Sequence, residues 1–226
     1  PYITLKQALP TSSTNPDLRI MDFSVKFVEG EIGFIMDAVY SDSAIKVWFY
    51  NNQKNAFHLI VGGKYKTCCL LNVSLIQVYK KLFLVVSATD GHLMFYNITD
   101  HIPFQVNKKC LQLVDNEPKI SLSSLPEYVL RLKVHQSGIK AITHKETSPG
   151  TFKIYTCGDD NAIGTCSIQF NESTGGLSGY ISDFNRNAAA STITSCALLQ
   201  DGKYLVTTSV DQVVKMWNIS SDKISL

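Results

Sequence analysis

The chain has 226 residues, of which 45% are hydrophobic and 18% are charged, so it can bury a sizeable core and is not a disordered polypeptide. Its formal net charge of +2 is too small to indicate nucleic-acid binding by overall attraction, so any basic surface would have to be local. No apolar run approaches the ~18 residues of a membrane-spanning helix, and we expect no membrane contact.

In chain order, the first element expected is a β-strand over residues 32–39, followed by Asp42 and, six residues later, Trp48. An Asp followed by Ser-Ala fits a tight hairpin turn. Further apolar runs that precede an Asp in the same way cover residues 82–88, 152–157 and 204–208. The runs are nearly continuous in hydrophobicity, which is typical of strands covered on both faces.

The unit of strand, Asp turn and strand therefore recurs four times. Its Asp residues are Asp42, Asp90, Asp160 and Asp211, and the residues six positions later are Trp48, Tyr96, Cys166 and Trp217. The intervals from Asp to Asp are 48, 70 and 51 residues. A WD repeat has a period of ~40–45 residues, so each interval is stretched and the middle one most.

An insertion explains the longest interval. Residues 101–127 contain three prolines and no sustained period, which predicts an irregular excursion between the third and fourth strands of one blade. The fourth strand resumes over residues 128–134. The repeats then cover about residues 18–61, 66–134, 138–183 and 192–220 of a single partial domain, 1–226.

These landmarks resemble those of the WD-repeat family, whose fold is an all-β, WD40-type β-propeller. In that family a corner His, a Ser or Thr of the second strand, the turn Asp and the third-strand Trp form a hydrogen-bonded column. Here all four Asp residues remain, but Trp is kept only at Trp48 and Trp217, and His135 is the one corner His. The repeat that His135 addresses has Cys166 in place of Trp, so no blade is complete and we expect softer blades.

Four blades leave open how the propeller closes, because WD propellers usually have about seven blades, within a range of 4–8 for propellers in general. The chain opens on Pro1 instead of Met, which favours a piece of a longer protein. Residues 1–9 could add the outer strand that the last repeat lacks. The favoured interpretation is that the remaining blades belong to the parent chain.

Short blocks resemble one subfamily, the WD-repeat subunit of the eukaryotic tRNA wobble-ribose 2′-O-methyltransferase, near its carboxyl end. The blocks are Val134–Ile139, Ala88–Leu93, Tyr96–Thr99 and Ser209–Gln212. The resemblance implies a scaffold that binds a separate methyltransferase of the FtsJ type and helps to place the tRNA anticodon loop. It adds no catalytic residue.

The sequence does not indicate an enzyme. It has no Gly-rich cofactor loop after a parallel strand, and its five His residues are scattered without a nucleophile at a recognisable spacing. The four turn Asp residues are better explained by blade architecture than by a carboxylate ring. The six cysteines include no C-x-x-C pair, so we expect no metal and no cofactor. We interpret four Asn sequons as chance occurrences in a cytoplasmic protein rather than as marks of a secreted glycoprotein.

The predicted loops differ in charge between the two faces of the propeller. The face of the Asp turns carries the acidic residues, partly balanced by Lys64, Lys66 and Arg186. The opposite face is richer in Lys, most densely at Lys80, Lys81, Lys108 and Lys109. Such a face attracts phosphate through its field and through counterion release, although lysines in loops also serve merely to keep a surface hydrated.

Two functions follow as hypotheses. The first is a non-catalytic subunit of a tRNA ribose-methylating complex, whose partners are the methyltransferase and, through the complex, tRNA. The second is a general protein–protein adaptor, of the ubiquitin-ligase or trafficking type, with no role in RNA. The first predicts a copurifying methyltransferase and salt-sensitive tRNA binding, and the second predicts neither.

Overall fold

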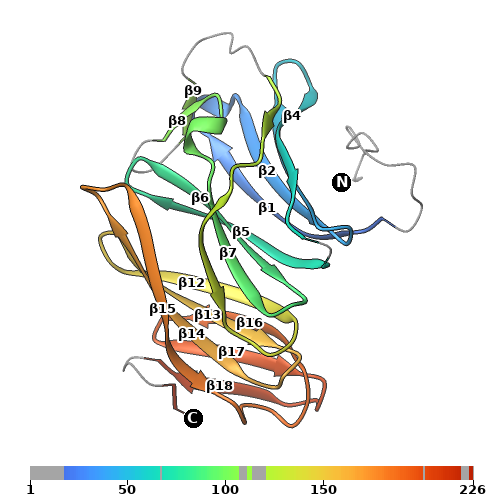
Figure 1. Cartoon of the computed structure of the whole chain (residues 1–226), viewed down its shortest axis with the longest axis vertical. Coiled ribbons are helices and arrows are strands. Elements are labelled where there is room, and N and C mark those ends of the chain that lie inside the picture. The colour runs from blue at the N-terminus through green and yellow to red at the C-terminus, as the bar shows by residue number, and fades with distance from the viewer. Residues whose placement is uncertain are drawn as a thin grey trace, which may run out of the picture.

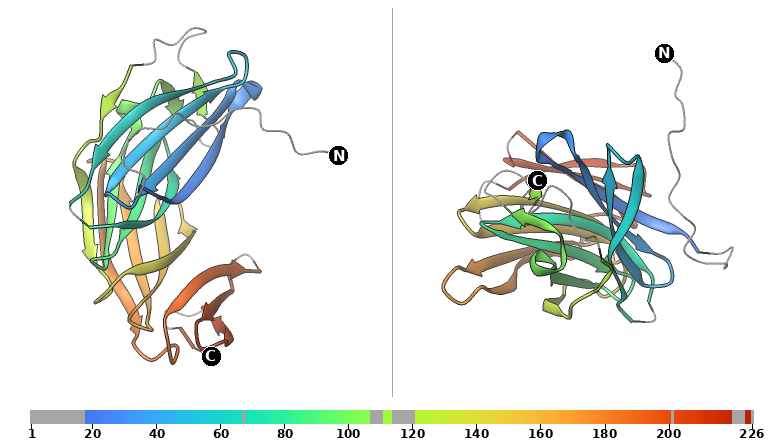
Figure 2. Two further views of the ribbon diagram at one scale, coloured as in Figure 1. Left: turned by 90° about the vertical axis from the view of Figure 1, so that its right-hand side faces the viewer. Right: turned by 90° about the horizontal axis from the view of Figure 1, so that it is seen from above.

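The computed structural model describes residues 18–66, 68–106, 111–113, 121–200, 202–219 and 224–225, and these residues form four β-sheets. The sheets follow one another along the molecule in chain order, from the blue strands to the red ones (Figure 1). Turned by 90°, they trace an open crescent with the first and last sheets at its two ends (Figure 2). The expected all-β fold with four blades is confirmed, as part of a propeller. The segment 1–9, the candidate closing strand, lies outside the described residues.

Each blade is an antiparallel meander whose second and third strands flank an Asp turn. Blade 1 contains β1 (Ile20–Val28), β2 (Gly33–Tyr40), β3 (Ala44–Asn51) and β4 (Ala56–Lys64), with η1 (Glu29–Glu31) between β1 and β2. Blade 2 contains β5 (Leu70–Val78), β6 (Lys81–Ala88), β7 (His92–Asn97) and β11 (Tyr128–Lys133). Blade 3 contains β12 (Ile139–Ser148), β13 (Thr151–Gly158), β14 (Ile163–Asn171) and β15 (Gly176–Asn185). Blade 4 contains β16 (Ile193–Leu199), β17 (Tyr204–Ser209) and β18 (Val214–Asn218).

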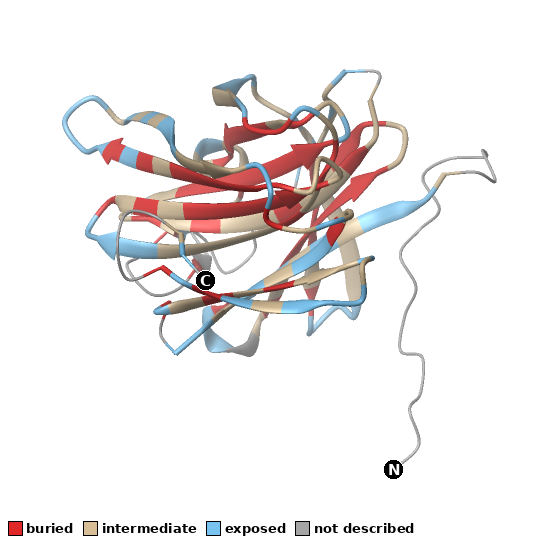
Figure 3. Cartoon of the chain, turned by 90° about the horizontal axis from the view of Figure 1, so that it is seen from below, coloured by how far each residue is buried: buried red, intermediate tan, exposed pale blue. Residues whose placement is uncertain are grey.

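Apolar cores lie between successive blades. Side chains buried between each pair of blades include Phe49 and Leu84, then Phe83 and Ile154, then Tyr155 and Trp217. The second strands of the two inner blades, β6 and β13, are buried almost continuously, as their unbroken hydrophobic runs predict, because a neighbouring sheet covers each face. In the last blade, β17 is buried only at Leu205 and Thr207, and buried and exposed stretches alternate over the molecule (Figure 3).

The two end blades each leave one face uncovered within the described chain. On β1 the alternate residues Phe23, Val25 and Phe27 are exposed, because the opposite face of that strand packs on blade 2. On β18, Val214 and Met216 are exposed in the same alternate pattern. Beside β18, the described chain adds only a bridge between Asn218 and Ser225.

The insertion is more ordered than the sequence predicts. Its described part contains η2 (Thr99–His101), β8 (Phe104–Val106), β9 (Leu111–Leu113) and β10 (Ser123–Ser124). The hairpin of β8 and β9 joins the inner edge of blade 1 next to β1, and β10 joins its outer edge next to β4. A segment of blade 2 thus extends the sheet of blade 1 on both sides.

The insertion lies between the third and fourth strands of blade 2, as predicted, but its described part forms short paired strands and is not irregular as expected. Ile102, Phe104 and Val106 alternate with other residues and are buried in the core between blades 1 and 2. The Phe104 ring meets the Phe49 ring edge-on, with 4.9 Å between ring centroids. The sequence does contain this alternation with a period of two. Pro103 obscures it, because proline is uncommon inside strands.

We predict that Phe104→Ala destabilises the protein, because it empties a filled position between two blades. The free energy of unfolding should fall by about 3–5 kcal/mol, the usual result of truncating a buried aromatic ring. Urea unfolding followed by tryptophan fluorescence measures the change. Leu122→Ala, in the same insertion but at an exposed position, is the control and should change stability by less than ~0.5 kcal/mol. Equal stability of Phe104→Ala and the parent protein would show that the insertion is only decoration.

Candidate interaction surfaces

Every turn Asp closes its hairpin in the same way. The residue after each Asp has a positive φ, at Ser43 (65°), Gly91 (74°), Asn161 (62°) and Gln212 (66°). One carboxylate oxygen accepts a hydrogen bond from the backbone N–H two residues later, at 3.2 Å for Asp42 and Asp90, 3.3 Å for Asp160 and 3.0 Å for Asp211. A left-handed residue in the turn is typical of the tight connections that match the twist of a hairpin. This geometry accounts for the repeated Asp without a catalytic role.

The second carboxylate oxygen usually accepts a hydrogen bond from the segment that connects the preceding blade to this one. Asp90 accepts from the Tyr65 hydroxyl at 3.3 Å, Asp160 from the Gln136 N–H at 2.9 Å, and Asp211 from the Ala190 N–H at 2.9 Å. Asp42 instead binds the Lys64 ammonium of its own blade at 2.6 Å. One side chain therefore ties a turn to a neighbouring blade at three of the four repeats.

The corner His is part of a buried hydrogen-bonded column in blade 3. His135 Nδ1 lies 2.7 Å from Asp160 Oδ1, and Nε2 lies 2.8 Å from the Thr156 hydroxyl. Burial by itself would raise the pKa of Asp160, but the hydrogen bonds from His135 and the Gln136 N–H hold it below the ordinary value. At Gly164 a Cβ would lie 2.6 Å from Val134 Cγ1 and 2.7 Å from the Thr156 hydroxyl that bonds His135, so a larger residue there would displace the column.

The column is completed differently in the other blades. In blade 4 the buried Trp217 indole donates to the Thr207 hydroxyl at 2.9 Å. Blade 1 has Ala38 at the position of Thr207, four residues before the turn Asp, and Trp48 Nε1 has no hydrogen-bond partner among the described residues. The Tyr40 hydroxyl lies near that nitrogen, outside hydrogen-bond geometry. The sequence correctly places both Trp side chains in the interior, but the missing acceptor of Trp48 is visible only once the strands are aligned.

A buried carboxylate that the sequence analysis missed lies on β2. Asp37 is fully buried, and the Ser24 hydroxyl lies 2.9 Å from both of its oxygens. Burial raises its pKa from 3.8 to about 7, against the lowering effect of Ser24 and with a smaller raising effect of Asp22. Asp37 interrupts the hydrophobic run of residues 32–39, and an interruption of that kind is a usable signal of a buried polar group.

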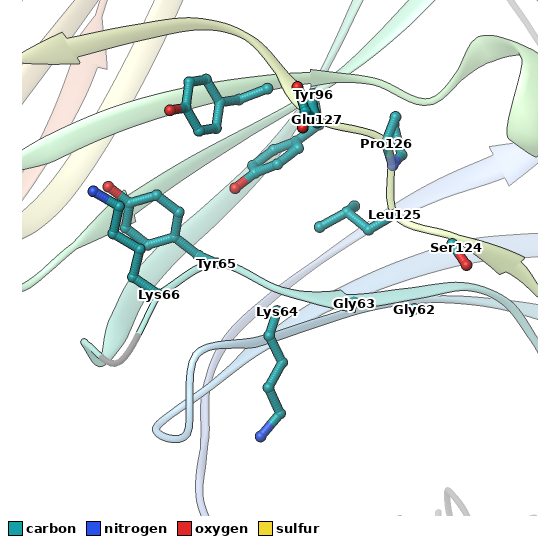
Figure 4. A pocket seen from close by; sticks show the side chains of 11 residues that line it. Gly62, Gly63, Lys64, Tyr65, Lys66, Tyr96, Ser124, Leu125, Pro126 and Glu127 are labelled. Atoms are coloured by element: carbon teal, nitrogen blue, oxygen red, sulfur yellow. The ribbon is translucent and has the colours of Figure 1, made fainter.

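A cavity of about 470 Å³ opens between the outer strands of blades 1 and 2, and we call it the inter-blade pocket. Its lining residues come from the end of β4, the following corner, β7 and the chain that leads into β11, and they are Gly62, Gly63, Lys64, Tyr65, Lys66, Tyr96, Ser124, Leu125, Pro126, Glu127 and Tyr128. Tyr65 and Tyr96 turn toward the same hollow, Leu125 lies across from them, and Lys64 points away (Figure 4). Tyr65 precedes its turn Asp, Asp90, by 25 residues, as His135 precedes Asp160, and this position is the signal that a search for His alone overlooks.

Only half of the predicted basic cluster lies within the described chain. Lys80 occupies the turn between β5 and β6, and Lys81 pairs with Asp100 at 3.8 Å. Lys108 and Lys109 lie outside the described residues. On the same face, Lys145 donates to the Gly202 carbonyl, and burial lowers the pKa of its ammonium. The basic face stays a prediction.

No group of His, Cys, Asp and Glu side chains suited to a metal ion occurs among the described residues. The cysteines within the described ranges are free thiols. No helix in that part of the chain is long and apolar enough to cross a membrane.

The family model described as "WD40: WD domain, G-beta repeat" matches residues 181–218, from the outer strand of blade 3 to the end of β18. The four sheets are blades of a WD40-type β-propeller. A search of curated proteins finds no significant match.

Solved structures with the same arrangement come from polycomb repressive complex 2. A chain in the crystal structure of the active complex in the basal state has a TM-score of 0.61 at 13% identity, covering 91% of this chain and 38% of that chain. A chain of the complex from Chaetomium thermophilum gives 0.61 at 13%, with 90% and 38% covered. The same organism's complex bound to GSK126 gives 0.60 at 14%, with 92% and 41% covered. The likeness concerns the fold, and this chain spans about two fifths of the length of the chains it resembles.

We predict that Thr207→Val lowers the free energy of unfolding by about 1–3 kcal/mol, because it keeps the shape of the side chain but leaves the buried Trp217 N–H without an acceptor. Chemical unfolding followed by tryptophan fluorescence measures it. Thr208→Val is the matched control on the neighbouring position, whose hydroxyl bonds in an exposed setting, and should shift stability by less than ~0.5 kcal/mol. Equal losses in the two variants would contradict the role of the Thr207 hydroxyl.

A second prediction concerns Asp37→Asn. The folded-state pKa of about 7 lies above the ordinary value of 3.8, so folding takes up a proton between these values and the parent protein loses stability as the pH rises through that window. The Asn variant lacks this loss. Its free energy of unfolding relative to the parent should therefore increase from pH 5 to pH 8, by about 1.4 kcal/mol for each pH unit of this range that lies below the folded-state pKa. Urea titrations at the two pH values measure the difference, and a constant difference would refute the buried, proton-binding carboxyl.

Proposed function

We propose that the protein is a non-catalytic scaffold that binds a methyltransferase of the FtsJ type and helps to place a tRNA anticodon loop for 2′-O-methylation of the wobble ribose, in the cytoplasm. The observation that carries this proposal is the resemblance of Val134–Ile139, Ala88–Leu93 and Ser209–Gln212 to that subfamily. The sequence has no Gly-rich cofactor loop, so the methyl-transfer chemistry is assigned to the partner.

The position of the blocks supports a rigid platform. The Gly91 carbonyl of one block accepts the N–H groups of Val134 at 3.0 Å and His135 at 3.2 Å from another. The Ile139 carbonyl accepts from the Asn72 amide at 2.8 Å and from the Ser87 hydroxyl at 3.2 Å. The bonds of Ile139 join blade 3 to blade 2, and those of Gly91 hold the start of the connection between these blades. A platform that holds enzyme and substrate in one geometry raises the reaction rate through orientation.

A general protein–protein adaptor is the second candidate. It is favoured by the structural likeness to chains from a multi-protein complex and by the tyrosine-lined inter-blade pocket. In both proposals the protein binds other proteins, but only the first gives it a role with RNA.

The deciding experiment uses the full-length protein, the FtsJ-type enzyme, tRNA and S-adenosylmethionine. We expect no methylation by the WD protein alone and methylation of the wobble ribose when the enzyme is added. Methylation by the enzyme at the same rate without the WD protein would contradict the proposal and leave the adaptor.

The basic face has its own test. Lys80→Glu should weaken tRNA use and reduce the slope of log affinity against log salt by roughly one, since one phosphate contact is lost. Arg186→Glu, on the opposite face, is the control of equal charge change and should leave the slope unchanged. An unaltered slope in Lys80→Glu would remove the basic face from the proposal, while enzyme binding should persist in both variants.

A further inference from the structure

The size of the inter-blade pocket suits an aromatic side chain together with a neighbouring residue. A volume of about 470 Å³ lies at the lower end of the roughly 300–1,000 Å³ typical of binding pockets. The Tyr128 ring meets the Tyr65 ring at a centroid distance of 6.5 Å and the Tyr96 ring at 6.3 Å, both edge-on. Edge-on tyrosines leave ring faces and edges to receive another aromatic ring.

A cationic occupant does not fit, because cations already lie against Tyr65. The Lys66 ammonium is 5.7 Å and the Arg131 guanidinium 5.9 Å from the Tyr65 ring centroid. A further positive group would meet their repulsion and would compete with them for the ring.

A polyanion such as a nucleic-acid backbone does not fit the inter-blade pocket either. Glu127 lines the pocket and has no partner among the described residues. Asp90 adds a second negative charge, within hydrogen-bond distance of the Tyr65 hydroxyl. Tyr65 remains neutral, since burial and then Asp90 raise its pKa to about 12. Lys66 and Glu127 lie on different sides of the pocket, so the charges around it suit a short segment of mixed character better than a polyanion (Figure 4).

One polar group in the pocket wall has no hydrogen-bond partner among the described residues. The Tyr96 side chain is almost completely buried, and its hydroxyl has no hydrogen-bond partner among the described residues. A buried hydroxyl without a partner costs free energy, which a ligand oxygen that reaches it would recover. Tyrosine and arginine together are typical of the small set of residues that dominate protein interfaces.

We propose that the inter-blade pocket binds an extended segment of a protein partner, with an aromatic side chain between Tyr65, Tyr96 and Tyr128 and an acidic residue beside Lys66. Leu125 and Pro126 form the apolar wall opposite Tyr65 and Tyr96. The inference rests on the proposed scaffold function, because it requires a protein partner, but it does not require that partner to be a methyltransferase.

The test uses small probes with the whole chain, so that it does not depend on knowing the partner. The probes are the blocked dipeptides acetyl-Asp-Trp-amide and acetyl-Lys-Trp-amide, uridine monophosphate and trimethyllysine, each measured by ligand-observed NMR. We expect the acidic dipeptide to bind in the millimolar range, as its size allows, and about tenfold more tightly than the basic one. Stronger binding of uridine monophosphate or trimethyllysine, or no dipeptide binding, would overturn the proposal.

Variants of the wall locate the binding site. Leu125→Trp should fill the pocket and abolish dipeptide binding. Tyr128→Ala removes one wall at a residue that is 41% exposed, so the fold should tolerate it while binding falls about tenfold. Tyr180→Ala, at an exposed tyrosine on β15, is the matched control and should bind as the parent does. Unchanged binding in both pocket variants would place the dipeptide elsewhere and refute the proposal.

A separate measurement keeps this inference apart from the proposed function. Affinity between the full-length protein and the FtsJ-type enzyme tests the methyltransferase role, whatever the dipeptides do. If the enzyme fails to bind while the acidic dipeptide binds in the pocket, the tRNA role fails and the pocket stands. If the enzyme binds and the dipeptide does not, the pocket fails and the tRNA role stands.

Discussion

The carboxylate of the turn Asp accepts hydrogen bonds from two separate parts of the chain at once, and the arrangement of the blades depends on both. One oxygen closes the hairpin within a blade, and the other reaches the connection from the preceding blade at Asp90, Asp160 and Asp211. Local hairpin geometry and blade-to-blade register are thus fixed by one side chain. This explains why Asp persists in all four repeats while the other members of the column change.

The remaining members of the column vary because several different donors can bind the turn carboxylate. A tyrosine hydroxyl, a histidine ring with a backbone N–H, and a backbone N–H alone occupy this place in successive blades. The third-strand position is less tolerant, since a Trp there buries an N–H that needs an acceptor. Thr207 provides it for Trp217, and blade 1 has Ala38 instead. The divergence therefore leaves particular polar atoms unpaired rather than weakening every blade equally.

The sequence predicts most of the fold because its strongest signals are local. Continuous apolar runs ahead of Asp42, Asp90, Asp160 and Asp211 identify the central hairpins, and the structure places β2, β6, β13 and β17 there. The path of the insertion could not be predicted, because the pairing of β9 with β1 and of β10 with β4 joins segments that are distant in sequence and very short. The inter-blade pocket was missed for the same reason: Tyr65, Tyr96 and Tyr128 lie 31 and 32 residues apart, far beyond the period of a strand or helix, and only the packing of two blades brings them together.

The route of the insertion also sets an order in which the chain can fold during synthesis. The strands of blade 1 are made first, but β8, β9 and β10, which complete its sheet, are made only after β5, β6 and β7 of blade 2. Until then, Val28 at one edge of the first sheet and Val61 and Gly62 at the other lack these pairings, and unpaired strand edges promote association between nascent chains. We therefore expect blades 1 and 2 to complete their folding together, in a step that requires loop closure over a long sequence separation.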